Sequence, residues 1–134
     1  MKLIRTEFRN FRILRDVEID FSTNDNKPLT VIRAENETGK TTMLRALQWG
    51  LFGEESLPNR GRDFRMHPID WNTNDGNEVK ISVEIDFTHK WERNILSGKS
   101  SGQTIEYKLL RTAREKITGK DSFERDASNL SLHK

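Results

Sequence analysis

Residues 29–52 read L-T-V-I-R-A-E-N-E-T-G-K-T-T-M-L-R-A-L-Q-W-G-L-F, and this stretch decides the fold. Its first four residues form an apolar run rich in β-branched side chains, which predicts a strand buried on both faces. Residues 34–42 match the phosphate-loop pattern G-x-x-x-x-G-K-[ST] except at the first glycine, where the chain has Ala34. A strand, a glycine-containing loop and a helix in this order predict a nucleotide-binding site.

The helical part of this stretch has apolar residues four positions apart. Met43, Leu47 and Leu51 form the predicted buried stripe, and Leu44 and Phe52 widen it. Gly53 is a suitable residue for the end of the helix. Trp49 lies on the same helix, so we expect it to pack against the core rather than to stack on a base.

The loop residues that carry chemistry are Gly39, Lys40, Thr41 and Thr42. Backbone N–H groups of a tight turn, together with the positive end of the following helix, form a site for anions. Gly39 lets the backbone approach phosphates where a Cβ would intrude. The alternative is a chance G-K-T-T at a helix start, where threonine is a good capping residue.

The rest of the chain divides into strands and one long loop. Period-two alternation predicts strands at residues 3–11, 17–21, 79–87, 91–96 and 105–110. Residues 56–78 predict a partly packed loop, with Phe64 and Trp71 as anchors to the core. The alternative is that these two aromatic residues, beside Arg62 and Arg65, form a stacking patch for single-stranded nucleic acid. We expect the three histidines, which are distant in sequence, to lie on the surface. The polar residues beyond Arg114 show no period that distinguishes helix from strand.

Composition excludes several classes of protein. The chain has 134 residues, no cysteine and a formal net charge of +2, so a disulfide scaffold and a cysteine-ligated zinc site are excluded. No signal peptide or membrane span is predicted, and we expect a cytoplasmic protein. The first fifteen residues contain five basic residues and only one acidic residue. This excess of positive charge indicates either solvated strand faces or a surface that faces phosphates.

Four segments together resemble one family of ATPases. T-E-F-R-N-F-R at residues 6–12 precedes V-E-I-D-F at 17–21, the phosphate-loop stretch at 29–47 and W-G-L-F-G at 49–53. The combination resembles the N-terminal lobe of an ATPase head of the SMC, RecF and RecN class. This AAA-like, ABC-type class of P-loop NTPases includes double-strand-break-repair ATPases and restriction or defence relatives such as DndD.

The resemblance implies a site for ATP and Mg²⁺. Thr41 would bind the metal, and the nucleotide would contact a set of eight residues, Arg12, Asn36, Glu37, Thr38, Gly39, Lys40, Thr41 and Thr42. Heads of this class are assembled from both ends of a long polypeptide, and two heads enclose two ATP molecules and engage DNA. The implied partners are therefore DNA, the C-terminal lobe of the same protein, a second head and, for some members, a nuclease, with no membrane.

No apolar strand in this chain ends in Asp-Glu, so the acid that organises Mg²⁺ and the general base are missing. We therefore expect no catalytic residue within these 134 residues and negligible hydrolysis by the chain alone. The string L-S-G-K-S-S-G-Q at residues 96–103 lies between strand patterns, which favours a hairpin turn over a signature motif.

The predicted fold class is α/β, an N-terminal lobe of a P-loop NTPase with one main helix after the phosphate loop. Its mixed sheet would combine a short parallel core with an antiparallel meander. We expect one lobe over residues 1–134, cut from a longer chain, with a phosphate-loop core (1–55), a loop (56–78), antiparallel strands (79–111) and an undecided end (112–134). The predicted function is ATP binding for DNA repair, chromosome maintenance or restriction. Two alternatives stay open: a nucleic-acid-binding module without ATPase activity, and a self-contained small P-loop kinase or GTPase.

Overall fold

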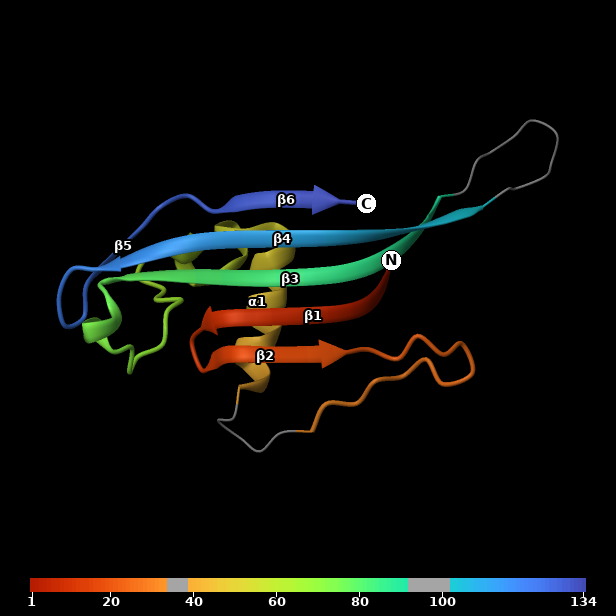
Figure 1. Cartoon of the computed structure of the whole chain (residues 1–134), viewed down its shortest axis with the longest axis horizontal. Helices are drawn as coiled ribbons and strands as arrows, with labels where there is room; N and C mark the ends of the chain where they lie inside the picture. Colours follow the sequence, from red (N-terminus) through yellow and green to blue (C-terminus); the bar gives the residue numbers. More distant parts are fainter. Residues whose placement is uncertain (34–38, 92–101) are drawn as a thin grey trace.

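The computed structural model describes residues 1–33, 39–91 and 102–134 (Figure 1). These residues form six strands, one α-helix and three short 3-10 helices. In chain order they are β1 (Lys2–Phe11), β2 (Leu14–Asp20), α1 (Lys40–Phe52), η1 (Glu54–Ser56), η2 (Pro58–Gly61), η3 (Thr73–Asp75), β3 (Glu78–Trp91), β4 (Gln103–Ile117), β5 (Phe123–Arg125) and β6 (Asn129–His133).

All six strands belong to one sheet with the order β2-β1-β3-β4-β5. β6 also pairs with β4, on the edge that β5 occupies further along the strand. Every pairing among the described residues is antiparallel. The predicted antiparallel meander is therefore confirmed, and the N-terminal strand β1 joins it by pairing with β3.

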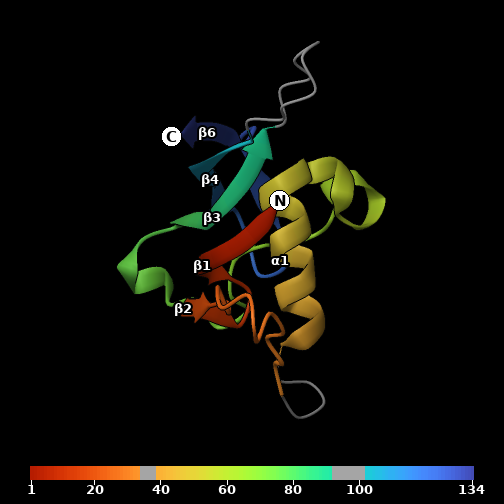
Figure 2. The same ribbon diagram turned by 90° about the vertical axis from the view of Figure 1, so that its right-hand side faces the viewer.

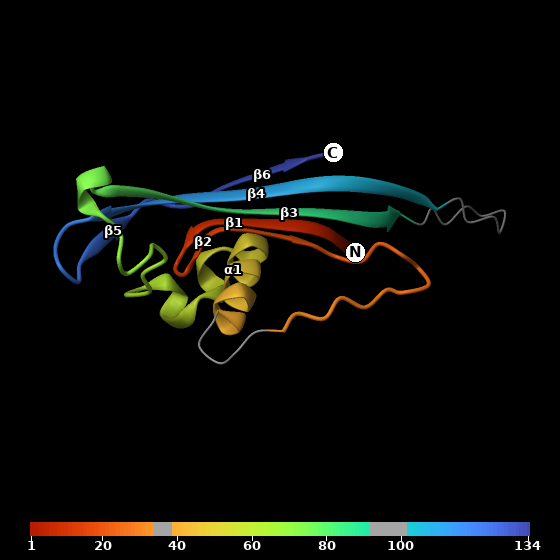
Figure 3. The same cartoon turned by 60° about the horizontal axis from the view of Figure 1, so that its bottom comes forward.

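The helix α1 covers one face of this sheet (Figures 2 and 3). The alternation predicted for β3 is confirmed, because Val79, Ile81, Val83 and Ile85 are all fully buried on that face. The helix comes close to the sheet at Gly50, where an added Cβ would lie 2.7 Å from Val83 Cγ1. A side chain at this position would hold the two layers apart.

This close approach shifts the buried face of α1 from the predicted one. The buried helix residues are Ala46, Trp49 and Gly50, whereas the predicted stripe of Met43, Leu47 and Leu51 is only partly buried. Leu44 and Phe52 are 58% and 70% exposed, so their assignment to the stripe was wrong. The expectation for Trp49 is confirmed, since its ring packs 5.9 Å from that of Phe11. Gly53 ends the helix as predicted.

The expectation of a parallel strand at residues 29–32 was wrong. Within the described part of the chain this segment forms no strand pairing, and Leu29, Val31 and Ile32 are 78%, 70% and 42% exposed. It runs apart from β2 (Figures 1 and 3), with Thr30 Oγ1 accepting a hydrogen bond from Ser22 N at 2.7 Å. An apolar run becomes a strand only where a neighbour pairs with its backbone, and the described residues supply none here.

The strand boundaries beyond residue 87 also differ from the prediction. β3 continues without interruption to Trp91, which pairs with Gln103 of β4, so residue 91 does not begin a separate strand. The hairpin turn predicted at residues 96–103 falls mostly on residues 92–101, which lie outside the described residues. The undecided end of the chain contains the last part of β4 and the short strands β5 and β6.

The long loop between α1 and β3 packs as predicted. Leu57, Phe64 and Met66 are buried, and the Phe64 ring lies 6.3 Å from that of Phe11. Trp71 is partly buried against the core. The loop is therefore part of the structure that surrounds the beginning of α1.

Candidate functional site

A cavity of about 610 Å³ lies at the N-terminal end of α1. Three segments that are distant in sequence line it: the turn between β1 and β2, the first residues of α1, and the loop before η3. The lining residues are Arg12, Ile13, Gly39, Lys40, Thr41, Thr42, Arg65, Pro68, Ile69 and Asp70. The structure thus brings together five of the eight residues predicted to contact a nucleotide.

The helix end that opens into this cavity has the features of an anion site. Gly39 has φ 104°, a left-handed conformation that favours glycine, and an added Cβ would lie 2.7 Å from Ile13 Cδ1. Among the described residues no side chain caps the helix start, and the first turn of α1 contains no acid. The amides of the first turn and the helix dipole therefore favour a negatively charged ligand.

Arg12 is held at the cavity wall by the loop opposite it. Its backbone N donates to Met66 O at 2.6 Å, and its Nε donates to Arg65 O at 2.9 Å. Its guanidinium lies 3.9 Å from the centre of the Phe64 ring. Burial lowers the pKa of Arg12, and the positive charges of Arg65 and Arg45 lower it further. Arg12 and Arg65 therefore both bring positive charge to the wall of the cavity.

A phosphate group fits these residues, and Mg²⁺ fits them when it shares phosphate oxygens. Thr41 supplies one hydroxyl, a hard oxygen of the kind Mg²⁺ prefers. Among the residues that the structure describes, no group of three His, Asp, Glu or Cys side chains could hold a metal ion. Asn36, Glu37 and Thr38 lie outside the described residues.

Sequence reasoning missed the wall formed by the loop residues 65–70. Arg65, Pro68, Ile69 and Asp70 line the cavity, yet no period or motif marks them. The only signal was a pair of basic residues, Arg62 and Arg65, within a predicted loop. The loop reaches the cavity through tertiary contacts, which a local pattern does not encode.

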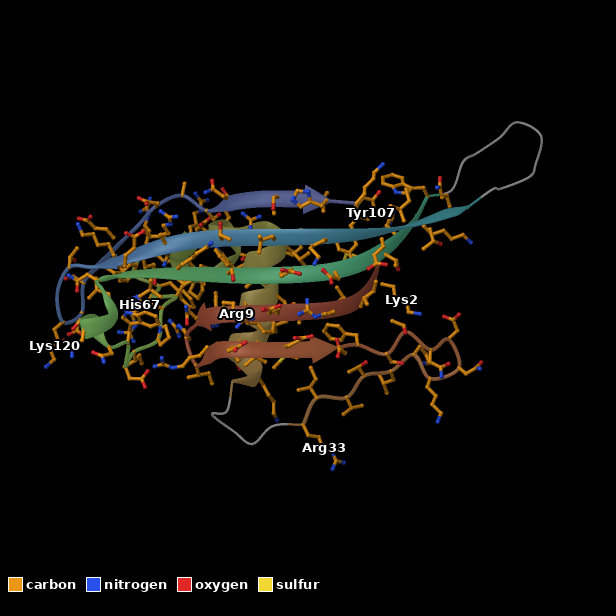
Figure 4. The ribbon with its side chains drawn as sticks, viewed as in Figure 1. Lys2, Arg9, Arg33, His67, Tyr107 and Lys120 are labelled. Atoms are coloured by element: carbon orange, nitrogen blue, oxygen red, sulfur yellow. The ribbon has the colours of Figure 1, made fainter. Side chains whose placement is uncertain are left out.

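Two of the other N-terminal basic residues, Arg5 and Arg9, do not extend this positive surface. Arg5 Nε lies 2.6 Å from Glu18 Oε1, and Arg9 Nη1 lies 2.6 Å from Asp16 Oδ1. Arg9 projects from β1 on the face of the sheet opposite α1 (Figure 4). For Arg5 and Arg9 the reading as a solvated strand face is confirmed. Arg12 lines the cavity, and Arg15 forms an ion pair with the lining residue Asp70.

The prediction that His67 lies on the surface was wrong. Its side chain is 7% exposed, and its Nδ1 lies 2.8 Å from Oε1 of the buried Glu115 (Figure 4 labels the histidine). The two residues are 48 positions apart. No spacing rule connects residues at such a separation, so the sequence contained no sign of the pair.

Comparisons with known proteins agree with the resemblance of the sequence. A family model described as an AAA domain matches residues 7–132. The relatives include SbcC, one of the subunits of the nuclease SbcCD, from Staphylococcus aureus strains JH9, Newman and USA300, each 31% identical over 91 residues. The matched region is 67% of this chain and 9% of each relative, so the chain spans only a small part of the curated relatives' length. Among the described residues, no helix combines the length and apolar character needed to cross a bilayer.

Proposed function

The chain belongs to the AAA domain family, within the SMC, RecF and RecN class of ATPases, and on that premise we propose that its cavity binds ATP with Mg²⁺. The main support for this proposal is that Arg12, Lys40, Thr41 and Thr42 line the same cavity. The helix end offers amides for the phosphates, and the arginine adds charge from the opposite wall.

Each residue of the cavity has a role that follows from its position. The Lys40 ammonium would lie between the β- and γ-phosphates, and the Thr42 hydroxyl would reach the α-phosphate. Thr41 would bind Mg²⁺, which neutralises phosphate charge when it is bound. Arg12, fixed by the loop carbonyls, would contact the phosphates from the other side. Asn36, Glu37 and Thr38 complete the proposed phosphate loop.

We propose that the chain is one lobe of a larger head and that the C-terminal lobe of the same protein covers residues 29–32. The exposed Leu29, Val31 and Ile32 support this, because large apolar side chains in a strand-forming run are rarely left in water. The second lobe would also supply the acidic residues that hydrolysis needs. DNA, a second head and a nuclease are the further partners that we propose.

The test compares two lysines in the whole protein by calorimetry with ATP and Mg²⁺. Replacing Lys40 with alanine (Lys40→Ala) should weaken ATP binding by about tenfold or more, because a charge-assisted contact to phosphate is lost. Its circular-dichroism spectrum should match that of the parent. Lys80→Ala removes an exposed lysine of β3 and should leave the affinity unchanged.

Equal ATP affinity in the parent and the Lys40→Ala variant would refute the assignment. If Lys40→Ala left ATP affinity unchanged but weakened salt-dependent DNA binding, the cavity would instead hold a backbone phosphate of nucleic acid.

A further inference from the structure

Glu115 is a fully buried carboxylate on β4, opposite Val79 in the sheet. Its Oε1 accepts hydrogen bonds from Met66 N at 2.9 Å, His67 N at 2.7 Å and His67 Nδ1 at 2.8 Å. Its Oε2 accepts two more from Arg125 of β5, from Nε at 2.9 Å and Nη2 at 2.6 Å. One side chain therefore joins β4 and β5 to the loop that forms the cavity wall.

Arg125 strengthens the same attachment. Its Nη1 donates to Gly61 O at 2.9 Å, and its Nη2 also donates to Phe64 O. Its side chain is only 9% exposed. The loop from residue 61 to residue 67 is thus held at its backbone by the ion pair of Glu115 and Arg125.

The attached loop in turn holds Arg12. Met66, whose N–H donates to Glu115, accepts a hydrogen bond from Arg12 N through its carbonyl oxygen. The preceding carbonyl, of Arg65, accepts from Arg12 Nε. A continuous chain of hydrogen bonds therefore runs from the carboxylate of Glu115 through two loop residues to the arginine of the cavity.

We propose that Glu115 is a positioning residue of the nucleotide cavity, which sets the places of Arg12 and Arg65 through the loop and Arg125. This inference rests on the function proposed above. An apolar residue opposite Val79 would fill the core without the desolvation cost of a buried charge. It would, however, leave the amides of Met66 and His67 without acceptors, and the loop would lose its fixed position.

Arg111 provides a matched comparison on the same strand. It is also buried, lies on the same face of β4 four residues earlier, and donates from Nε to Gly50 O at 3.1 Å. Its Nη1 donates to Ser128 Oγ at 3.0 Å. These contacts hold the C-terminal part of α1 and the segment after β5, and Arg111 does not line the cavity. Its loss should affect the fold without affecting the place of Arg12.

The first experiment measures ATP affinity in the whole protein for Glu115→Gln, Arg12→Ala and the double variant. Glu115→Gln keeps the shape of the side chain but puts an N–H₂ group where an acceptor is needed. We expect a loss of affinity of about tenfold. The double variant should lose much less than the product of the two single losses, because Glu115 acts through Arg12. Arg111→Met should reduce thermal stability and leave the affinity within about twofold of the parent.

The second experiment needs no nucleotide. In a nitrogen-15 spectrum of this chain, the Arg12 Nε–H that donates to Arg65 O should give a signal protected from exchange with water. Glu115→Gln should remove this protection, and Arg111→Met should retain it. Arg125→Gln serves as a second variant if Glu115→Gln does not fold, with the same expected loss.

The outcomes separate the inference from the proposed function. A folded Glu115→Gln with parental affinity and a protected Arg12 signal, or additive losses in the double variant, would overturn the positioning role. If Lys40→Ala left ATP binding intact, the proposed function would fail. The Arg12 signal would still decide whether Glu115 positions Arg12.

Discussion

Two apolar, β-branched runs in this molecule have opposite surroundings. β3 lies between β1 and β4, under α1, and its inward residues Val79, Ile81, Val83 and Ile85 are fully buried. Residues 29–32 have no strand beside them in the part of the chain that is described, and Leu29, Val31 and Ile32 are exposed. The difference shows that the core of this chain closes around β3. Within the described residues, residues 29–32 lie outside that core.

The largest predicted effect compares one isoleucine from each run. Ile85→Ala should reduce the free energy of unfolding by about 2–5 kcal/mol, because it removes fully buried methyl groups and leaves a cavity. Ile32→Ala, at a side chain that is 42% exposed, should cost less than about 1 kcal/mol in this chain. Urea denaturation of the two variants measures both values.

The same pair sharpens the proposal of a second lobe. In the whole protein, Ile32→Ala should become markedly more destabilising, whereas the cost of Ile85→Ala should stay in the same range. Equal costs for Ile32→Ala with and without the rest of the protein would contradict the idea that residues 29–32 are covered there.

An intermediate effect on stability is expected where α1 packs closely against β3. Gly50→Ala should destabilise the chain by about 1–3 kcal/mol, because its Cβ would lie 2.7 Å from Val83 Cγ1 and 3.2 Å from Ile85 Cδ1. Alanine has the higher helix propensity, so an exposed site would show a gain instead. Thermal unfolding of Gly50→Ala, with Gln48→Ala on the exposed side of α1 as control, distinguishes packing from propensity.

The smallest effect concerns the outer face of the sheet, where β1 and β3 present charges instead of core residues. Hydrogen bonds from Arg5, and then from Arg9, lower the pKa of Glu7 below its ordinary value of 4.5. Glu7 therefore binds protons more readily in the unfolded chain. Its contribution is complete above pH 4.5 and is lost as pH falls through the lowered pKa.

Replacing Arg5 with methionine should reduce the loss of folding stability at acid pH by less than about 1 kcal/mol, because the ion pair of Arg5 and Glu7 is partly exposed to solvent. Asp86 lies on the same face, and its contribution to stability changes with pH in the opposite direction. Burial raises the pKa of Asp86, so the folded chain binds this proton more readily and gains stability as the pH falls. Asp86→Asn should therefore make the acid loss steeper than in the parent. Unfolding measured between about pH 3 and pH 7 would contradict both expectations if the three curves were parallel.

The sequence predicted those features of the structure that depend on residues close together in the chain, and it did not predict those that depend on distant residues. Periods and motifs of a few residues predict the alternation of β3, the antiparallel strands, the end of α1 at Gly53 and the place of residues 39–42 at the helix start. The state of residues 29–32 could not be predicted, because an apolar run does not reveal whether a neighbouring strand exists. The cavity wall at Arg65 and the pair of His67 and Glu115 depend on contacts between residues 53 and 48 positions apart, which no local pattern records.

The order of the strands along the chain has a consequence for synthesis on the ribosome. β1 and β2 are made first and can pair with each other, but the other neighbour of β1 is β3, which begins at Glu78. α1 also emerges before the strand against which it packs. The nascent N-terminal half therefore exposes Phe8, Phe11 and Trp49 until β3 has left the exit tunnel, and during this interval a chaperone that binds aromatic segments would find its targets there.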